Sequence, residues 1–207
     1  MKLPLSDFDF PFPEELIATQ PAEPRDASRL MVVERATGAW RHHHFSDLPQ
    51  FLEAGDCLVL NTTRVAACRL IGKKITGGKA EILLVKELEP GLWAALGSGL
   101  KNGATVLFPG ELEGRLEGLN DDGEYLVRFA RKDMNSYMDS YGAAPVPPYI
   151  AKKRPPRAND LERYQTVYAD EKGSIAAPTA GLHFTPELLE TLRSRGVKTA
   201  EVTLHVG

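Results

Sequence analysis

The residues best suited to chemistry lie in the stretch A-A-P-T-A-G-L-H-F-T, from Ala176 to Thr185. Thr179 and His183 place a hydroxyl and an imidazole four positions apart, and small neighbours such as Gly181 let a ligand approach the backbone closely. Histidine is the side chain whose ordinary pKa suits proton transfer near neutral pH. The stretch therefore predicts either a ligand-binding loop with an acid–base histidine or a tight loop whose histidine is hydrogen-bonded.

A helix signal follows this stretch directly. Thr185 is a good N-cap, Pro186 suits the first helical position, Glu187 complements the positive end of a helix, and Gly196 closes it. Backbone N–H groups at a helix N-terminus attract polar or anionic ligand atoms. We also expect this helix end to lower the pKa of His183 and keep its imidazole neutral.

Polar groups cluster at two earlier points. Arg25 and Arg29 lie in a charged segment directly before an apolar strand, where a ligand contact and a structural ion pair are equally open. Asn61 and Arg64 end the run L-V-L-N-T-T-R, and polar groups at the end of such a strand commonly face a crevice in α/β folds. The guanidinium of Arg64 could clamp a carboxylate or a phosphate.

The other histidines and the two cysteines are not spaced like metal ligands. His205 lies on the last expected strand, on the same face as Thr203. The run His42–His44 would alternate between the faces of a strand, which is poor chelating geometry. Cys57 and Cys68 lack metal spacing, and we expect both to be buried free thiols. We expect no metal site.

The only concentrated basic run is K-K-R-P-P-R, which contributes Lys152, Lys153, Arg154 and Arg157. Its prolines favour an extended path. A solvated linker and a set of contacts to nucleic-acid phosphates are both open from the residues alone. The net charge of −3 over 207 residues argues against a generally basic nucleic-acid coat, so any RNA contact must be local. Long apolar runs and a signal-peptide pattern are both missing, so we expect a cytoplasmic protein without membrane contact.

The strand, helix and turn signals along the chain predict a mixed α+β fold with two domains. Six short strands separated by turns such as Gly77-Gly78 and Pro109-Gly110 suggest a small antiparallel β-barrel at 70–142. We interpret the barrel as an insertion into a larger α/β-type domain formed by 1–69 and 143–207.

Seven segments of the chain resemble, in order, the S-adenosylmethionine:tRNA ribosyltransferase-isomerase family of queuosine biosynthesis. They are D-F-D-F-P-F-P-E-E-L-I-A at Asp7–Ala18, R-D-A-S-R-L at Arg25–Leu30, N-T-T-R-V at Asn61–Val65, P-V-P-P-Y-I at Pro145–Ile150, R-Y-Q-T-V-Y-A at Arg163–Ala169, the stretch Ala176–Thr185, and T-L-H-V-G at Thr203–Gly207.

The resemblance implies an enzyme that uses S-adenosylmethionine as a ribosyl donor rather than a methyl donor. The ribosyl group is transferred and isomerised onto 7-aminomethyl-7-deazaguanine at the tRNA wobble position, giving epoxyqueuosine-tRNA with release of adenine and methionine. Such a reaction needs a base beside the sulfonium, an acid for the departing adenine and an aligned neutral amine. The partners would be tRNA and S-adenosylmethionine, with no metal, and we expect a monomer.

Carried onto this sequence, the resemblance makes His183 and His205 the candidate catalytic residues, with the roles of base and acid left open. It also favours phosphate contact for the basic run. The candidate substrate-binding residues are Arg29, Asn61, Arg64, Tyr149, Arg163, Tyr164, Gln165, Thr179 and Gly181, and the candidate tRNA-phosphate residues are Lys152, Lys153, Arg154 and Arg157.

The sequence departs from the family pattern at three points. Thr62 stands where the family usually has Asp or Asn, and Ala67 stands where it often has Pro. Family members also continue past T-L-H-V-G, so we expect either a fragment or a natural short form. The alternative function is therefore a noncatalytic remnant of the enzyme that binds tRNA or a nucleoside.

Overall fold

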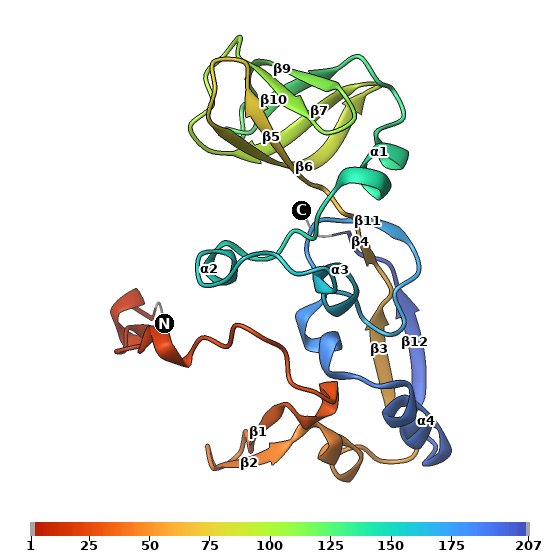
Figure 1. Cartoon of the computed structure of the whole chain (residues 1–207). Coiled ribbons are helices and arrows are strands. Elements are labelled where there is room, and N and C mark those ends of the chain that lie inside the picture. Colours follow the sequence, from red (N-terminus) through yellow and green to blue (C-terminus); the bar gives the residue numbers. More distant parts are fainter. Residues whose placement is uncertain (1–2, 206–207) are drawn as a thin grey trace.

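The computed structural model describes residues 3–205, and its largest element is a closed antiparallel β-barrel (Figure 1). Tight turns join neighbouring strands; Gly77 and Gly78, with φ of 89° and 83°, close the first hairpin. The strands follow the order β10-β7-β6-β5-β8-β9 around the barrel, which confirms the predicted mixed fold with a barrel. They are β5 (Arg69–Lys74), β6 (Lys79–Glu89), β7 (Leu92–Gly97), β8 (Thr105–Phe108), β9 (Leu112–Leu119) and β10 (Tyr125–Phe129).

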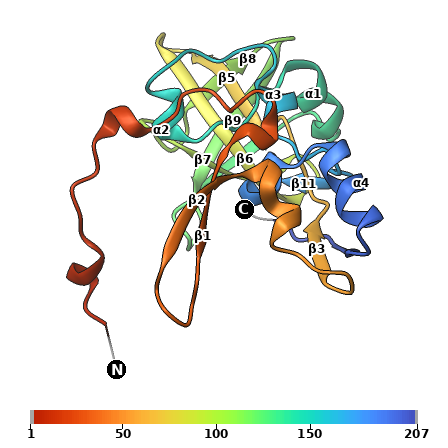
Figure 2. The same cartoon turned by 90° about the horizontal axis from the view of Figure 1, so that it is seen from below.

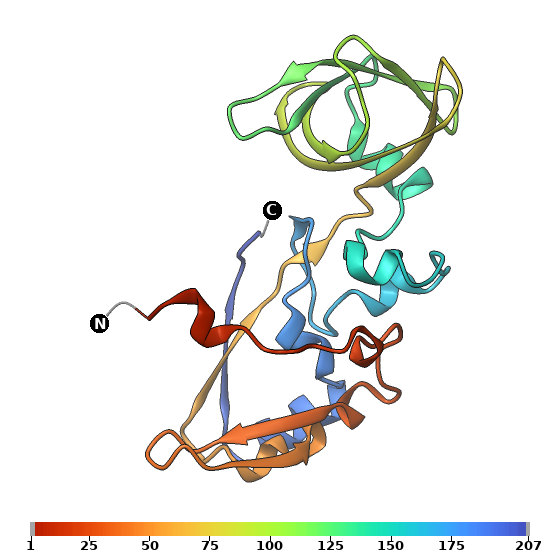
Figure 3. The same cartoon turned by 90° about the vertical axis from the view of Figure 1, so that its left-hand side faces the viewer.

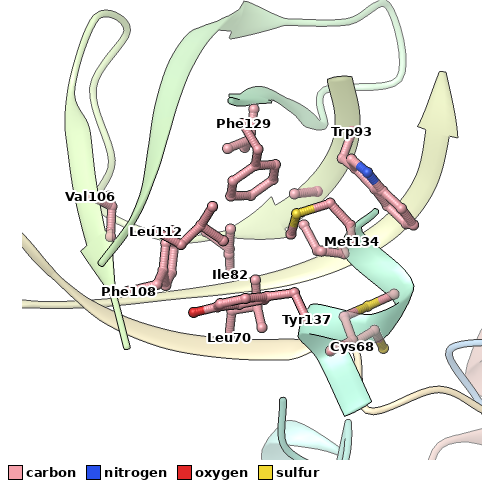
Figure 4. Close-up of a cluster of buried hydrophobic side chains, with 14 of the residues drawn as sticks. Cys68, Leu70, Ile82, Trp93, Val106, Phe108, Leu112, Phe129, Met134 and Tyr137 are labelled. Carbon is pink, nitrogen blue, oxygen red and sulfur yellow. The ribbon is translucent and has the colours of Figure 1, made fainter. Parts of the chain in front are cut away.

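Alternate side chains of these strands fill the barrel interior (Figure 4). Ile82 on β6 and Leu70 on β5 are each only 1% exposed. Helix α1 (Met134–Tyr141) adds Met134 and Tyr137 to the same cluster, and the Tyr137 hydroxyl donates to the Pro109 carbonyl at 2.6 Å. Full burial of one such side chain contributes about 1.5–3 kcal/mol, so apolar contact is what holds the barrel together.

The other strands form three two-stranded sheets. The antiparallel hairpin is β1 (Arg29–Val33) with β2 (Trp40–His44). The parallel pairs are β3 (Cys57–Asn61) with β12 (Lys198–Val202), and β4 (Arg64–Val65) with β11 (Lys172–Ser174). The helices are α2 (Pro148–Ala151), α3 (Asp160–Arg163) and α4 (Pro186–Ser194), with short 3₁₀ helices at Leu5–Phe8, Glu14–Leu16, Arg25–Ala27, Phe45–Gln50 and Thr179–His183.

A second apolar cluster joins α4 to this part of the chain. Leu188, Leu189 and Leu192 pack with Phe45 and Phe184. The Thr185 hydroxyl caps α4 by accepting from the Leu188 N–H at 3.1 Å, as its sequence predicts. The barrel and the β1–β2 hairpin lie at opposite ends of the molecule (Figures 1 and 3). Viewed from below, the hairpin projects from the body, and the N-terminal arm runs away from it (Figure 2).

The chain enters and leaves the barrel at adjacent points. Arg69 and Ala143 exchange two backbone hydrogen bonds, at 2.9 and 3.2 Å. Beside them, a Cβ on Gly142 would lie 1.8 Å from the Ala67 carbonyl oxygen, so only glycine fits there. The bounds of the two predicted domains, 1–69 with 143–207 and 70–142, stay a prediction.

Cys57 corrects one expectation, because its side chain is exposed rather than buried. Among the described residues, strand β3 pairs with β12 alone and has an uncovered face, on which Val59 is 61% exposed. Cys68 is buried as expected, and burial raises the pKa of its thiol to about 12. Within residues 3–205, no helix combines the length and apolar character needed to span a bilayer.

Candidate functional site

A pocket of about 350 Å³ opens between α2, α3 and the N-terminal segment 18–23. Tyr149 of α2, Tyr164 and Arg163 at the end of α3, and Thr179 of the A-A-P-T-A-G-L-H-F-T stretch all line it. The structure thus brings together four of the residues predicted to bind substrate, from three separate segments of the sequence. Arg154 and Arg157 of the basic run also line the pocket.

Arg154 forms the wall of the pocket through a buried ion pair. Its guanidinium donates two hydrogen bonds to the Asp160 carboxylate, at 2.6 and 2.9 Å, and a third to the Thr19 carbonyl at 2.7 Å. The side chains of Arg154 and Asp160 are only 12% and 8% exposed. Hydrogen bonding from Arg154 holds the pKa of the Asp160 carboxyl below its ordinary value. The sequence predicts Arg154 as an RNA-phosphate contact, but its guanidinium is already engaged inside the protein.

The other basic residues of the run are exposed. Lys152 and Arg157 have exposed side chains, and Lys153 donates its ammonium group to the Glu14 carbonyl of the N-terminal arm. The backbone N–H of Arg157 donates to Asp160 at 2.8 Å. Arg157 lines the pocket, and its guanidinium has no hydrogen-bond partner within residues 3–205.

The α3 end of the pocket is tied to the N-terminal arm by Arg163. Its guanidinium donates to the Ala22 carbonyl at 2.7 Å and pairs with Glu23 at 2.8 Å. Burial raises the pKa of the neighbouring Tyr164 phenol, which therefore stays protonated at neutral pH. The pocket therefore offers the protonated phenol of Tyr164 beside the guanidinium of Arg163, which is already hydrogen-bonded and ion-paired.

Arg25 links the pocket to His183, although the sequence predicts Arg29 rather than Arg25 as the binding residue of this charged segment. The Arg25 guanidinium donates to three carbonyls, of Gln165 at 2.7 Å, Glu162 at 3.1 Å and Leu182 at 3.2 Å. It thereby fastens α3 to the loop that carries His183. The available signal was the position of Arg25 directly after a proline and before the strand, within R-D-A-S-R-L.

His183 is half-buried beside the ring of Phe45, at a centroid distance of 5.3 Å. Burial is the main factor that lowers the pKa of its imidazole, and the positive charge of Arg25 adds to the effect. The direction of this pKa shift agrees with the sequence-based expectation, but it arises from burial and Arg25 rather than from the helix end. Within residues 3–205 the imidazole has no hydrogen-bond partner, so the alternative of a hydrogen-bonded structural histidine lacks support.

His205 lies in a different cluster, where the parallel strands β3 and β12 end. Its Nδ1 is 2.7 Å from the hydroxyl of Thr63, which is fully buried. Its ring covers Gly173, where an added Cβ would lie 2.8 Å from Nε2. Asn61 accepts from the Leu204 N–H and donates to the Leu204 carbonyl, each at 3.0 Å, and so fixes the segment before His205.

The other predicted residues hold backbone rather than line the pocket. Arg64 donates to the Ala169 and Asp170 carbonyls at 2.5 and 3.2 Å. Gln165 donates to the Val65 carbonyl at 2.7 Å and accepts from its N–H at 2.9 Å. Gly181 allows close packing, because a Cβ there would lie 2.1 Å from the Tyr168 hydroxyl. Arg29 lies apart from these residues, exposed on the β1–β2 hairpin.

The lining of the pocket suits a ligand that is partly planar and carries charge. Tyrosine faces attract planar rings and cations, and a free guanidinium binds carboxylates or phosphates. Residues 3–205 contain no group of three or more His, Cys, Asp or Glu side chains placed to hold a metal ion.

Comparison with known proteins gives consistent matches along the chain. The family model described as "Queuosine biosynthesis protein" matches residues 5–207. An S-adenosylmethionine:tRNA ribosyltransferase-isomerase of Thermotoga petrophila is 48% identical over 206 residues, covering 98% of this chain and 60% of the relative. The protein of the same name from Desulfitobacterium hafniense is 51% identical over 209 residues, with the same coverage.

A solved structure also matches. The crystal structure of S-adenosylmethionine tRNA ribosyltransferase from Thermotoga maritima is 35% identical, covers 97% of this chain and 58% of that chain, and has a TM-score of 0.40. The present chain spans 60% of the length of the curated relatives described above.

Proposed function

The chain belongs to the queuosine biosynthesis protein family, and from this premise we propose that it acts in ribosyl transfer from S-adenosylmethionine to tRNA. The acceptor is 7-aminomethyl-7-deazaguanine at the wobble position, and the products are epoxyqueuosine-tRNA, adenine and methionine. The observation that carries this proposal is the pocket that collects Tyr149, Tyr164, Arg163 and Thr179 beside the His183 loop.

The pocket is proposed to hold S-adenosylmethionine. The exposed ring of Tyr149 would stack on the adenine or face the positively charged sulfonium, both of which a tyrosine ring attracts. The guanidinium of Arg157, which has no hydrogen-bond partner within residues 3–205, would bind the carboxylate of the methionine part. Arg163 and Asp160, whose charges are already paired, would keep the pocket walls in place.

His183 is proposed as the base. Its lowered pKa leaves the imidazole neutral at pH 7, so a ring nitrogen can take the acidic proton beside the sulfonium. Arg25 holds the loop carbonyl just before it, which fixes the approach of the ring. His205 is proposed as a second proton-transfer group, held through Thr63.

The test is release of free adenine when the chain is mixed with S-adenosylmethionine and tRNA bearing the deazaguanine. The variant His183→Ala should slow release by about 10²- to 10⁴-fold while leaving tRNA affinity nearly intact. The variant His43→Ala is a matched control, because its imidazole lies on the β1–β2 hairpin and packs on Phe51. Equal adenine release by wild type and His183→Ala would remove His183 from the mechanism. Tight tRNA binding by the wild type with no adenine release would favour the noncatalytic binding protein.

Binding of S-adenosylmethionine, measured calorimetrically, tests the pocket without requiring turnover. Arg157→Gln removes one charge-assisted hydrogen bond and should weaken binding by about tenfold or more. Arg131→Gln, a change at an exposed arginine outside the pocket, should leave the affinity unchanged. Identical affinities for wild type and Arg157→Gln would move the donor site elsewhere.

A further inference from the structure

The β1–β2 hairpin has one face that nothing in the described chain covers. Residues directly opposite each other in an antiparallel pair share a face, and the pairs here include Met31 with His42 and Val33 with Trp40. The side chains of Trp40, Met31 and Val33 are 60%, 58% and 56% exposed. They form a contiguous apolar surface. We call this surface, together with Arg29, His42 and His44 on the same side of the hairpin, the outer face.

The opposite face of the hairpin packs against the body of the protein, so the exposure of the outer face does not come from a detached hairpin. Leu30 packs against the cluster around Phe45, and the His43 ring lies 4.9 Å from the ring of Phe51. The hairpin is therefore seated on the body by one face, and its register presents the outer face to solvent. A large exposed apolar surface of this kind commonly marks an interaction site.

Arginines outnumber acids on the hairpin. Arg29 lies on the outer face, Arg35 lies in the turn, and Arg41 lies opposite Val32 on the other face, and all three are exposed. None of these arginines has an acidic partner within residues 3–205, whereas Arg69 pairs with Glu81 in the barrel. The acid of this hairpin, Glu34, accepts instead from the Thr37 hydroxyl at 2.6 Å.

We propose that the outer face binds an unpaired RNA loop, with a base stacked on Trp40 and phosphates held by Arg29 and Arg35. Single-stranded bases are commonly recognised by exposed aromatic rings flanked by arginine. The indole of Trp40 contacts the His42 ring edge-on at a centroid distance of 5.0 Å, and the two rings together form one aromatic surface. This inference rests on the proposed tRNA partner and adds the element that contacts its loop.

The experiment uses the whole chain and two RNA probes, a stem–loop with guanine at the wobble position and a fully paired duplex of equal length. Of the two tryptophans, Trp93 is only 7% exposed, so Trp93→Phe leaves Trp40 as the sole fluorescent reporter. Stacking predicts that the stem–loop quenches Trp40 more strongly than the duplex does. Circular dichroism confirms that each variant is folded.

Trp40→Leu should weaken stem–loop binding by about 5- to 150-fold, which corresponds to the loss of one stacked base. Met31→Leu keeps the apolar area of the same face and should bind like the wild type. Arg29→Gln and Arg35→Gln should each lower the slope of log affinity against log salt by about 0.7.

Three results would overturn the inference, and each is distinguishable from failure of the proposed function. If the wild type binds the stem–loop and Trp40→Leu binds equally well, the outer face is not the site, although the tRNA partner stands. Binding to anionic vesicles in place of RNA would identify a lipid surface instead. A dimer that Trp40→Leu dissociates would identify a second copy of the chain. Absence of any tRNA binding by the wild type would count against the proposed partner itself.

Discussion

The barrel and the part of the chain that surrounds the pocket are stabilised in different ways. Barrel strands are joined by short turns, and their inward side chains, such as Val106 and Val127, are completely buried. Around the pocket, distant segments are joined by single polar side chains, as when Arg25 binds three carbonyls more than a hundred positions away. The comparison indicates that apolar burial supplies the scaffold, while polar cross-links set the geometry of the site.

The largest expected effect comes from deleting apolar volume in the barrel. Ile82→Ala should lower the free energy of unfolding by about 2–5 kcal/mol, because the removed methyl groups leave a cavity in a fully packed interior. Urea unfolding measures the change. Leu107→Ala is the matched control on another barrel strand, β8, since Leu107 is 43% exposed. A small loss for Ile82→Ala, similar to that of the control, would contradict a barrel held by apolar packing.

A smaller effect is expected at the pocket wall. Asp160→Asn breaks the paired carboxylate and should lower the free energy of unfolding by about 1–3 kcal/mol at neutral pH. Asp121→Asn, in an exposed barrel turn, should change stability little. Weakened S-adenosylmethionine binding by Asp160→Asn alone would further connect the ion pair to the shape of the pocket.

The stability difference between the wild type and Asp160→Asn should depend on pH, because the pKa of the Asp160 carboxyl is lowered in the folded protein. A carboxyl whose folded pKa lies below its unfolded value, about 3.9, stabilises the fold above that value and loses the contribution as pH falls through the folded pKa. The stability difference between wild type and Asp160→Asn should therefore be full near pH 6 and shrink below about pH 4. A difference that stayed constant over this range would show that ionisation of Asp160 is not involved.

The smallest expected change in stability concerns Arg25. Arg25→Met should lower the free energy of unfolding by about 0.5–1.5 kcal/mol and raise the pKa of His183, because a nearby positive charge is removed. Histidine NMR titration follows the pKa, and Arg29→Met is the control, since Arg29 has no partner in the described chain. An unchanged His183 pKa in Arg25→Met would separate the polar cross-link from the electrostatics of the loop.

The same contrast explains which features could be predicted from the sequence. The barrel depends on local hairpins, whose turns are visible as pairs such as Gly77-Gly78, so its strands and closure follow from short-range patterns. Strand β3 pairs with β12, which lies far along the chain. The apolar sequence of β3 does not reveal that the face carrying Val59 is exposed. The exposure of Cys57 was wrongly predicted for this reason.

The sequence indicates candidate site residues by their type but not by their partners. Tyr149, Tyr164 and Thr179 do meet in one pocket, whereas Asn61 and Gln165 spend their amide groups on backbone. An arginine that binds carbonyls and one that awaits a ligand look alike in sequence, because the difference lies in where distant backbone groups end up. Only three-dimensional contacts distinguish the two.

The paired hydrogen bonds between Arg69 and Ala143 have a consequence for the order of folding. If the inserted segment were unfolded, joining β3 to β12 would require closing a long flexible loop, with an entropic cost that grows as the logarithm of its length. Once the barrel has formed, its two ends are already held side by side, and the flexible part of that loop is roughly halved. We therefore expect the barrel to fold first and to speed assembly of the pocket, and a barrel-destabilising change such as Ile82→Ala should slow refolding of both parts together.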